Sequence, residues 1–117
     1  MIYNIDVDDI LDKDNRILDI CKDDMNKRTI IICRTCDLSR IYMKLKYNLK
    51  KVSLIQYRYK WKYHNDDWNN FISKDNNILI TDKLNLKINN IDIYKIIYYC
   101  KTIKCNIKSN NIYYFSE

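Results

Sequence analysis

The chain has 117 residues, which is enough for one domain around one hydrophobic core. It contains no glycine and no proline and carries a formal net charge of +6. The lack of glycine excludes a glycine-rich phosphate-binding loop, and no apolar run approaches the ~18 residues that span a membrane.

The first twenty residues form an acidic segment, in which six aspartates stand against one lysine and one arginine. The basic region and apolar core of a signal peptide are not found there. We expect residues 1–20 to be an acidic N-terminal arm, with either a helix over 7–20 or an edge strand. The domain proper is expected to comprise residues 21–117.

Short segments of β type follow, separated by Asn and Asp clusters that take the place of Gly and Pro in turns. Residues 42–49 and 52–63 alternate between apolar or aromatic side chains and polar ones, as half-buried strands do. The other expected strands are residues 29–33, 77–81, 83–88, 94–102 and 111–115. Strands at spacings near ten residues predict an all-β fold, specifically an immunoglobulin-like β-sandwich in a single domain.

The stretch 38–65 carries eight lysines and arginines and no acidic residue. Basic side chains interleaved with tyrosines can bind single-stranded nucleic acid, can meet an acidic protein surface, or can simply be solvated. The sequence leaves these three alternatives open.

Cys33 and Cys36 form a Cys-x-x-Cys pair at the end of an apolar run. A zinc site completed by Cys100 and Cys105 would have uneven ligand spacing. A redox pair would need a helix to begin at the motif, and the residues that follow look strand-like. In a sandwich, Cys33 would face Cys100, and Tyr98 would occupy the tyrosine-corner position. Disulfides are therefore favoured over zinc and redox chemistry.

His64 is the only histidine. It lies in the sequence YHNDDW, with no nucleophile and orienting group that would make a catalytic set. We therefore expect no enzyme activity, no cofactor and no metal.

Three segments together resemble the interleukin-18 binding proteins that poxviruses secrete. IIICRTC is similar to the strand that holds that family's core cysteine, and VSLIQYRY to its ligand-binding strand. KLNLKINNIDIYKIIYYCKT is similar to its last strands, and the resemblance covers about residues 21–103. It implies a secreted, non-catalytic viral decoy that binds interleukin-18 and blocks its receptor, in a mature form without its signal peptide.

The resemblance also implies how the cysteines pair. Cys33 would bridge to Cys100 in the core, and Cys21 would bridge to Cys36. Cys105 would then be left to join two copies in a disulfide-linked homodimer.

Ligand-binding residues follow from the same resemblance. The cytokine-facing side chains would be Leu54, Gln56 and Arg58, with Tyr42, Lys44 and Tyr47 beside them. The register of the neighbouring strand stays open between Tyr42 and Tyr47 as its exposed aromatic. No nucleic-acid or membrane partner is expected. The alternative is a basic, tyrosine-rich nucleic-acid-binding module or a small zinc-stabilised domain.

Overall fold

The computed structural model describes residues 1–83, 86, 88, 91–100 and 107–116. The described residues form six strands, three α-helices and one 3₁₀ turn. In chain order they are β1 (Ile2–Ile5), α1 (Ile10–Lys22), β2 (Thr29–Ile32), α2 (Thr35–Leu49), β3 (Val52–Ile55), η1 (Trp61–Tyr63), α3 (Asn65–Ile72), β4 (Ile78–Thr81), β5 (Lys95–Tyr98) and β6 (Asn111–Phe115).

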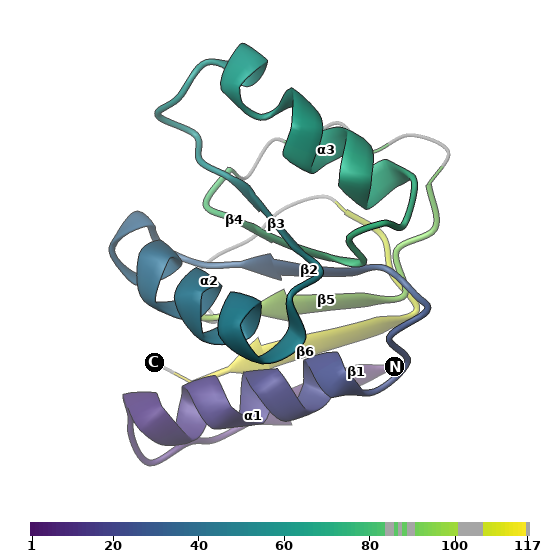
Figure 1. Cartoon of the computed structure of the whole chain (residues 1–117). Helices are drawn as coiled ribbons and strands as arrows, with labels where there is room; N and C mark the ends of the chain where they lie inside the picture. The colour runs from purple at the N-terminus through teal and green to yellow at the C-terminus, as the bar shows by residue number, and fades with distance from the viewer. Residues whose placement is uncertain (84–85, 87, 89–90, 101–106, 117) are drawn as a thin grey trace.

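The strands form one sheet in the order β1-β6-β5-β2-β4-β3, and every neighbouring pair is parallel. All four residues are buried in each of β2, β4 and β5, and apart from Thr29, Thr81 and Lys95 at the strand ends the buried residues are apolar or aromatic. Parallel neighbours need crossover connections, and helices supply the first three of them. Figure 1 shows α1 and α2 side by side in front of the sheet, with α3 packed against β3 at the opposite edge from β1.

The helices are amphipathic and bury one face each. On α2 the buried apolar residues Leu38, Ile41 and Leu45 are spaced by three and four positions, which is the helical period. Ile17 of α1 and Phe71 of α3 are each 0 % exposed and join the same hydrophobic core. No helix in the described part of the chain is long and apolar enough to span a lipid bilayer.

The prediction of an all-β, immunoglobulin-like sandwich is wrong. Residues 42–49 belong to α2, where Met43 and Tyr47, which the strand pattern placed on a buried face, are exposed. The strand expected over 52–63 ends at Ile55 and continues into a loop and η1. Strands do form within residues 29–33, 77–81, 94–102 and 111–115, but as a parallel sheet, and 83–88 lies partly outside the described residues.

The acidic segment 1–20 contributes to this sheet. Its first residues form β1, which pairs with β6, and the next ones form most of α1. Asp9 caps α1, because its carboxylate accepts a hydrogen bond from the Asp12 N–H at 2.8 Å.

Neither predicted disulfide is formed, because Cys21, Cys33 and Cys36 carry free thiols. Cys21 is buried on α1, whereas Cys36 is exposed in the first turn of α2. Cys105, on which the predicted homodimer depends, lies outside the described residues. Within the described ranges no group of three or more His, Cys, Asp or Glu side chains could hold a metal ion.

Candidate functional site

The carboxyl ends of all six strands meet at one edge of the parallel sheet. The chain leaves β2 toward β3 on one side and leaves β5 toward β6 on the other, and β2 and β5 are neighbours. In open α/β sheets, ligands bind outside the carboxyl ends of the strands at such a reversal of direction. The ends of β2 and β5 are therefore the first place to look for a site.

The exposed start of α2 lies at this reversal. Arg34, the N-cap residue, makes no side-chain capping bond, so the first N–H groups of the helix have no cap from its side chain. The Arg34 guanidinium instead donates to the Asp37 carboxylate at 3.2 Å, and the Thr35 hydroxyl donates to the Asp82 carboxylate at 2.7 Å. A helix N-terminus with an arginine and a hydroxyl beside it suits an anionic ligand.

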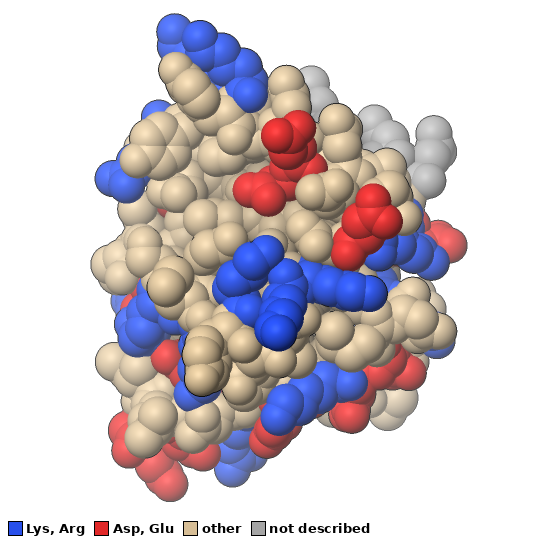
Figure 2. Space-filling model, in the orientation of Figure 1, with Lys and Arg blue, Asp and Glu red and all other residues tan. Residues whose placement is uncertain are grey.

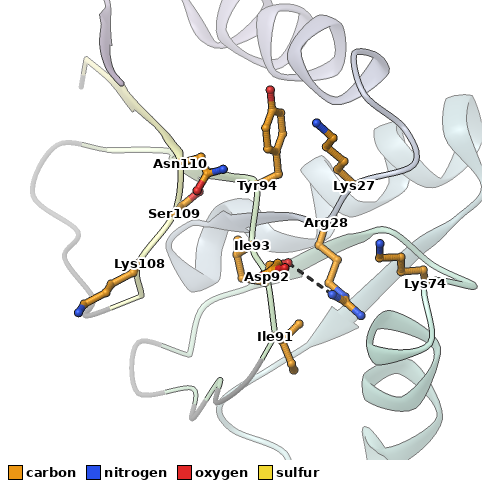
Figure 3. A pocket seen from close by; sticks show the side chains of 10 residues that line it. All are labelled: Lys27, Arg28, Lys74, Ile91, Asp92, Ile93, Tyr94, Lys108, Ser109 and Asn110. Atoms are coloured by element: carbon orange, nitrogen blue, oxygen red, sulfur yellow. Dashed lines mark hydrogen bonds between the residues drawn. The ribbon is translucent and has the colours of Figure 1, made fainter.

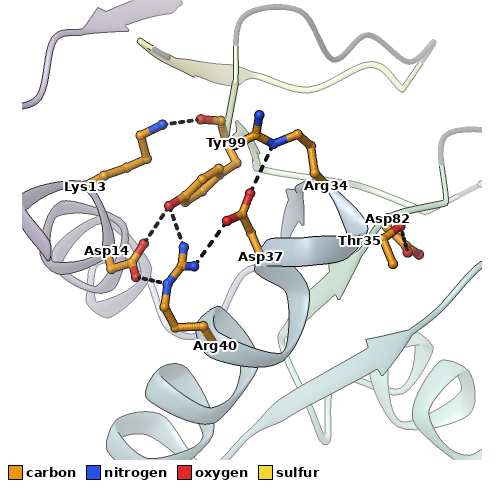
Figure 4. Close-up of polar contacts among 8 residues, drawn as sticks. All are labelled: Lys13, Asp14, Arg34, Thr35, Asp37, Arg40, Asp82 and Tyr99. Carbon is orange, nitrogen blue, oxygen red and sulfur yellow. Dashed lines mark hydrogen bonds and ion pairs between the residues drawn. The ribbon is translucent and has the colours of Figure 1, made fainter. Parts of the chain in front are cut away.

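A buried polar network supports this start of α2 (Figure 4). Arg40 donates to Asp14 at 2.8 Å, to Asp37 at 3.1 Å and to the Tyr99 hydroxyl at 2.6 Å, and that hydroxyl donates to Asp14 at 3.1 Å. Burial first, and then the Asp14 charge, raises the pKa of Tyr99 well above its usual range. The network joins α1, α2 and the end of β5, and it therefore holds the start of α2 in a fixed position relative to these two elements.

Charges in this cluster balance. It holds three cations, Lys13, Arg34 and Arg40, and three carboxylates, Asp14, Asp37 and Asp82. Lys13 is buried and donates to the Tyr99 carbonyl at 3.0 Å. Only the Arg34 side chain, which is 54 % exposed, is free to turn toward a ligand without opening the buried network.

The predicted ligand-binding residues separate into two groups. Leu54 and Gln56 at the end of β3 line one hollow beside α3, and Arg58 follows in the adjoining loop. Tyr42, Lys44 and Tyr47 all lie on α2, where Lys44 is hydrogen-bonded to Asn15. The expected single binding face across two strands is not present in this arrangement.

The basic stretch 38–65 is also divided. It runs through most of α2, then β3, the following loop and η1. Figure 2 shows lysines and arginines interspersed with acidic side chains over this side of the molecule, rather than gathered into one basic face. The alternative of a module built on that stretch as a single tyrosine-rich basic surface is therefore not supported.

Another hollow lies at the opposite edge of the sheet, before β2 and β5 (Figure 3). It has a volume of about 610 Å³ and four lining cations, Lys27, Arg28, Lys74 and Lys108. The Arg28 guanidinium is hydrogen-bonded to the main chain, because it donates to the carbonyls of Phe71, Ile72 and Asp92. Lys27 lies over the Tyr94 ring. Arg28 and Lys27 are thus engaged within the fold, and the hollow lies at the opposite edge of the sheet from the reversal.

Sequence reasoning missed the polar residues that make the site. Arg34, Thr35 and Asp82 each follow a buried strand directly, or within two or three residues, and Tyr99 follows another. Polar side chains at the ends of successive apolar runs, with amphipathic segments between them, are the signal that a parallel sheet gives.

This geometry defines a class, the RecA-like α/β domain with a parallel six-stranded sheet. Several of the solved structures that it resembles are DEAD-box proteins, and another is the C-terminal domain of a Sulfolobus solfataricus SWI2/SNF2 ATPase. A DEAD box protein from Methanococcus jannaschii superposes with a TM-score of 0.75 at 16 % identity, over 97 % of this chain and 35 % of that one. Escherichia coli SrmB, bound to the regulator of ribonuclease activity A, has a TM-score of 0.70 at 12 % identity, over 99 % and 76 %.

Saccharomyces cerevisiae Dbp5 bound to RNA and ADP BeF3 is similar as well, with a TM-score of 0.71 at 18 % identity over 86 % of this chain. The chain spans about half of a Dbp5 C-terminal domain bound to Gle1 (55 %) and about a quarter of longer Dbp5 chains (24 % and 26 %). No protein-family model and no curated protein sequence matches the chain. At these identities the likeness shows the fold.

The resemblance to poxvirus interleukin-18 binding proteins is thereby overturned. A parallel RecA-like sheet has no immunoglobulin-type pair of sheets on which that cytokine surface could be built. The predictions of a viral decoy, of interleukin-18 as partner and of no nucleic-acid partner are corrected with it, since the similar structures include DEAD-box proteins, among them Dbp5 bound to RNA.

Proposed function

We propose that the chain is a RecA-like domain of RNA-helicase type that binds the sugar–phosphate backbone of single-stranded RNA. The observation that carries the proposal is the exposed start of α2, with Arg34 and Thr35, at the reversal between β2 and β5. The shared fold with DEAD-box proteins, among them Dbp5 bound to RNA, supports it.

A phosphate oxygen at this position would accept hydrogen bonds from two kinds of donor, while the Thr35 hydroxyl keeps its bond to Asp82. The donors are the N–H groups of the first turn of α2 and the Arg34 guanidinium. Arg34 must give up its bond to Asp37, whose side chain is only 7 % exposed. The exchange does not leave a buried charge unpaired, because Asp37 stays bound to Arg40.

We infer that this domain does not hydrolyse ATP by itself. The chain has no glycine and so cannot form the loop that cradles nucleotide phosphates in P-loop enzymes. Any hydrolysis that it assists would need a second domain, as the larger size of the similar DEAD-box chains suggests.

Fluorescence anisotropy with a labelled single-stranded RNA tests the proposal. Arg34→Ala should weaken binding by about tenfold, because a charge-assisted hydrogen bond is lost, and should reduce the salt slope by about 1. Arg16→Ala is the matched control, because Arg16 is 53 % exposed and pairs with Asp12 on α1 in the same way. Equal effects of the two substitutions, or no RNA binding by the unmodified chain, would contradict the proposal.

A further inference from the structure

The hollow at the end of β3 differs in character from the proposed phosphate site. It has a volume of about 470 Å³, within the usual range for small-molecule sites. Its lining residues come from β3, the following loop, η1 and α3; they are Leu54, Gln56, Tyr59, Tyr63, His64 and Asp67. The proposed phosphate site makes no use of these side chains.

His64 gives the hollow a defined shape, because this buried side chain holds the loop that lines it. It is 6 % exposed, and its Nε2 atom lies 3.0 Å from the Gln56 carbonyl oxygen and 3.3 Å from the Gln56 backbone nitrogen. The Tyr59 and Trp61 rings meet the imidazole edge-on at 6.3 and 6.4 Å. The loop is thus fastened back onto the end of β3.

An aromatic series continues from this loop into the core. Trp61 packs on Trp68 at 5.5 Å between ring centroids, and Trp68 packs on the fully buried Phe71 at 6.2 Å. The segment that carries the rings bordering the hollow is therefore attached to the core through Trp61.

Two tyrosine rings give the hollow flat apolar walls. Tyr59 is 46 % exposed and Tyr63 is 68 % exposed. Exposed aromatic side chains gathered on one segment mark an interaction site rather than a solvated loop. Arg58 lies over the Tyr59 ring at 4.9 Å and Lys62 over the Tyr63 ring at 5.1 Å, so positive charge borders each aromatic wall.

One side of the hollow is polar. Asp67 lines it with a half-buried carboxylate, whose pKa burial raises. Its main-chain carbonyl is fixed by the Ser53 hydroxyl at 2.7 Å. The Gln56 amide, on the facing element, supplies both a donor and an acceptor.

Asp82 links this hollow to the start of α2. One of its carboxylate oxygens accepts from the Thr35 hydroxyl at 2.7 Å, and the other accepts from the Tyr57 N–H at 2.8 Å, where the aromatic loop begins. A strand bound by its phosphates at Thr35 is therefore next to the loop whose rings line the hollow.

We propose that this hollow binds a single nucleobase, stacked against Tyr59 and Tyr63 and recognised along its edge by Asp67 and Gln56. The base can belong to an RNA strand or to a free nucleotide, and the RNA case rests on the proposed function. Carboxylates accept hydrogen bonds from exocyclic amines, and glutamine pairs with adenine through two bonds. The hollow therefore prefers adenine, cytosine or guanine, which carry an amine, over uracil.

Intrinsic fluorescence measures binding directly, because both tryptophans of the chain, Trp61 and Trp68, belong to the aromatic series behind the hollow. Titration with AMP, CMP, GMP and UMP should give saturable quenching with the first three and the weakest binding with UMP. Tyr63→Ala should lower affinity by about tenfold, as loss of one stacking partner does. Tyr47→Ala is the control, because Tyr47 is 84 % exposed on α2 away from the hollow. Asp67→Asn should remove the discrimination against UMP.

RNA oligonucleotides distinguish the two sources of the base. Loss of oligo(A) binding in Tyr63→Ala, with Arg34→Ala also weakened, supports a base held next to the phosphate site. Nucleotide binding without RNA binding would leave the hollow as a mononucleotide site and would overturn the proposed function alone. RNA binding that Tyr63→Ala leaves unchanged, together with no nucleotide-dependent quenching, would overturn the hollow alone. Quenching by an acidic peptide but by no nucleotide would also overturn it, because it would assign the hollow to a protein partner.

Discussion

The guanidinium of Arg40 donates to the carboxylate of Asp14 at 2.8 Å and so ties α2 to α1. The Asp14 side chain is 5 % exposed, whereas that of Arg40 is 40 % exposed, so the partner that cannot reach water is the acid. A buried carboxylate is tolerated only when its charge is met. The Arg40–Asp14 pair therefore matters more to stability than its partly exposed arginine suggests.

Arg40→Ala should lower the free energy of unfolding by about 1–3 kcal/mol. The value is below that of a fully buried pair because water screens the exposed side of Arg40. Urea unfolding followed by circular dichroism measures it, and Arg16→Ala, which removes an exposed pair with Asp12, should cost less than about 0.5 kcal/mol. If the two variants lost equal stability, the Asp14 charge would have another source of compensation.

Lys95 of β5 is hydrogen-bonded to main-chain carbonyls at the C-terminal end of α1. Its Nζ atom donates to the carbonyls of Ile20 and Asp23, each at 2.6 Å, and the residue is 3 % exposed. Lys95→Met should cost about 2–4 kcal/mol, because two carbonyls lose a charged donor. Lys22→Met, at an exposed position of the same helix end, should change stability by no more than about 0.5 kcal/mol. Thermal unfolding of the two variants separates these outcomes, and a stable Lys95→Met would show that the carbonyls find other donors.

Much of the strand content could be predicted because parallel core strands are unbroken apolar runs. TIII and ILIT became β2 and β4 as the sequence indicated. The helices between them were not predicted, because a chain without glycine or proline lacks the residues that usually mark where helices end. In α2, apolar and polar residues alternate by chance over 42–49, although the spacing of Leu38, Ile41 and Leu45 already carries the helical period. Missing that helix turned an α/β pattern into an all-β one.

The site could be predicted only in part. The Cys33–Cys36 motif lies at the end of β2, beside the candidate site, but the sequence predicted disulfides there. A helix does begin within the motif, at Thr35, contrary to the expectation of a strand. Asp14 and Tyr99 are 85 residues apart and meet only because β5 lies beside β2 in the sheet. No local sequence pattern specifies that strand order.

Alkaline pH should destabilise the fold through Cys21. Burial raises the pKa of its thiol from 9.0 to about 12, and Lys95 offsets this only in part. Above pH ~9 the unfolded thiol loses its proton while the folded one keeps it, so the folded state binds more protons. The stability from this group is complete below pH ~9 and is lost as the pH rises toward ~12, by about 1.4 kcal/mol per pH unit.

Urea unfolding of Cys21→Ala between pH 7 and pH 10.5 should show a shallower decline than that of the unmodified chain. Some decline should persist, because the pKa of Cys33 is also raised by burial. Cys36→Ala, at an exposed position, should leave the slope unchanged. An identical slope in Cys21→Ala and the unmodified chain would mean that water reaches the Cys21 thiol in the folded state.

Thiol reactivity distinguishes the free cysteines from the disulfides that the sequence suggested. In a Cys105→Ser background, Cys36 should react at once with Ellman's reagent, because it is exposed in the first turn of α2. Cys21 and Cys33 are buried and should react only after denaturant is added. The further substitution Cys36→Ser should abolish the fast phase without changing the slow one. A chain purified without reductant that shows no fast phase, and whose peptide map joins Cys36 to Cys21, would restore the predicted bridge and would contradict the packing of α1 against α2.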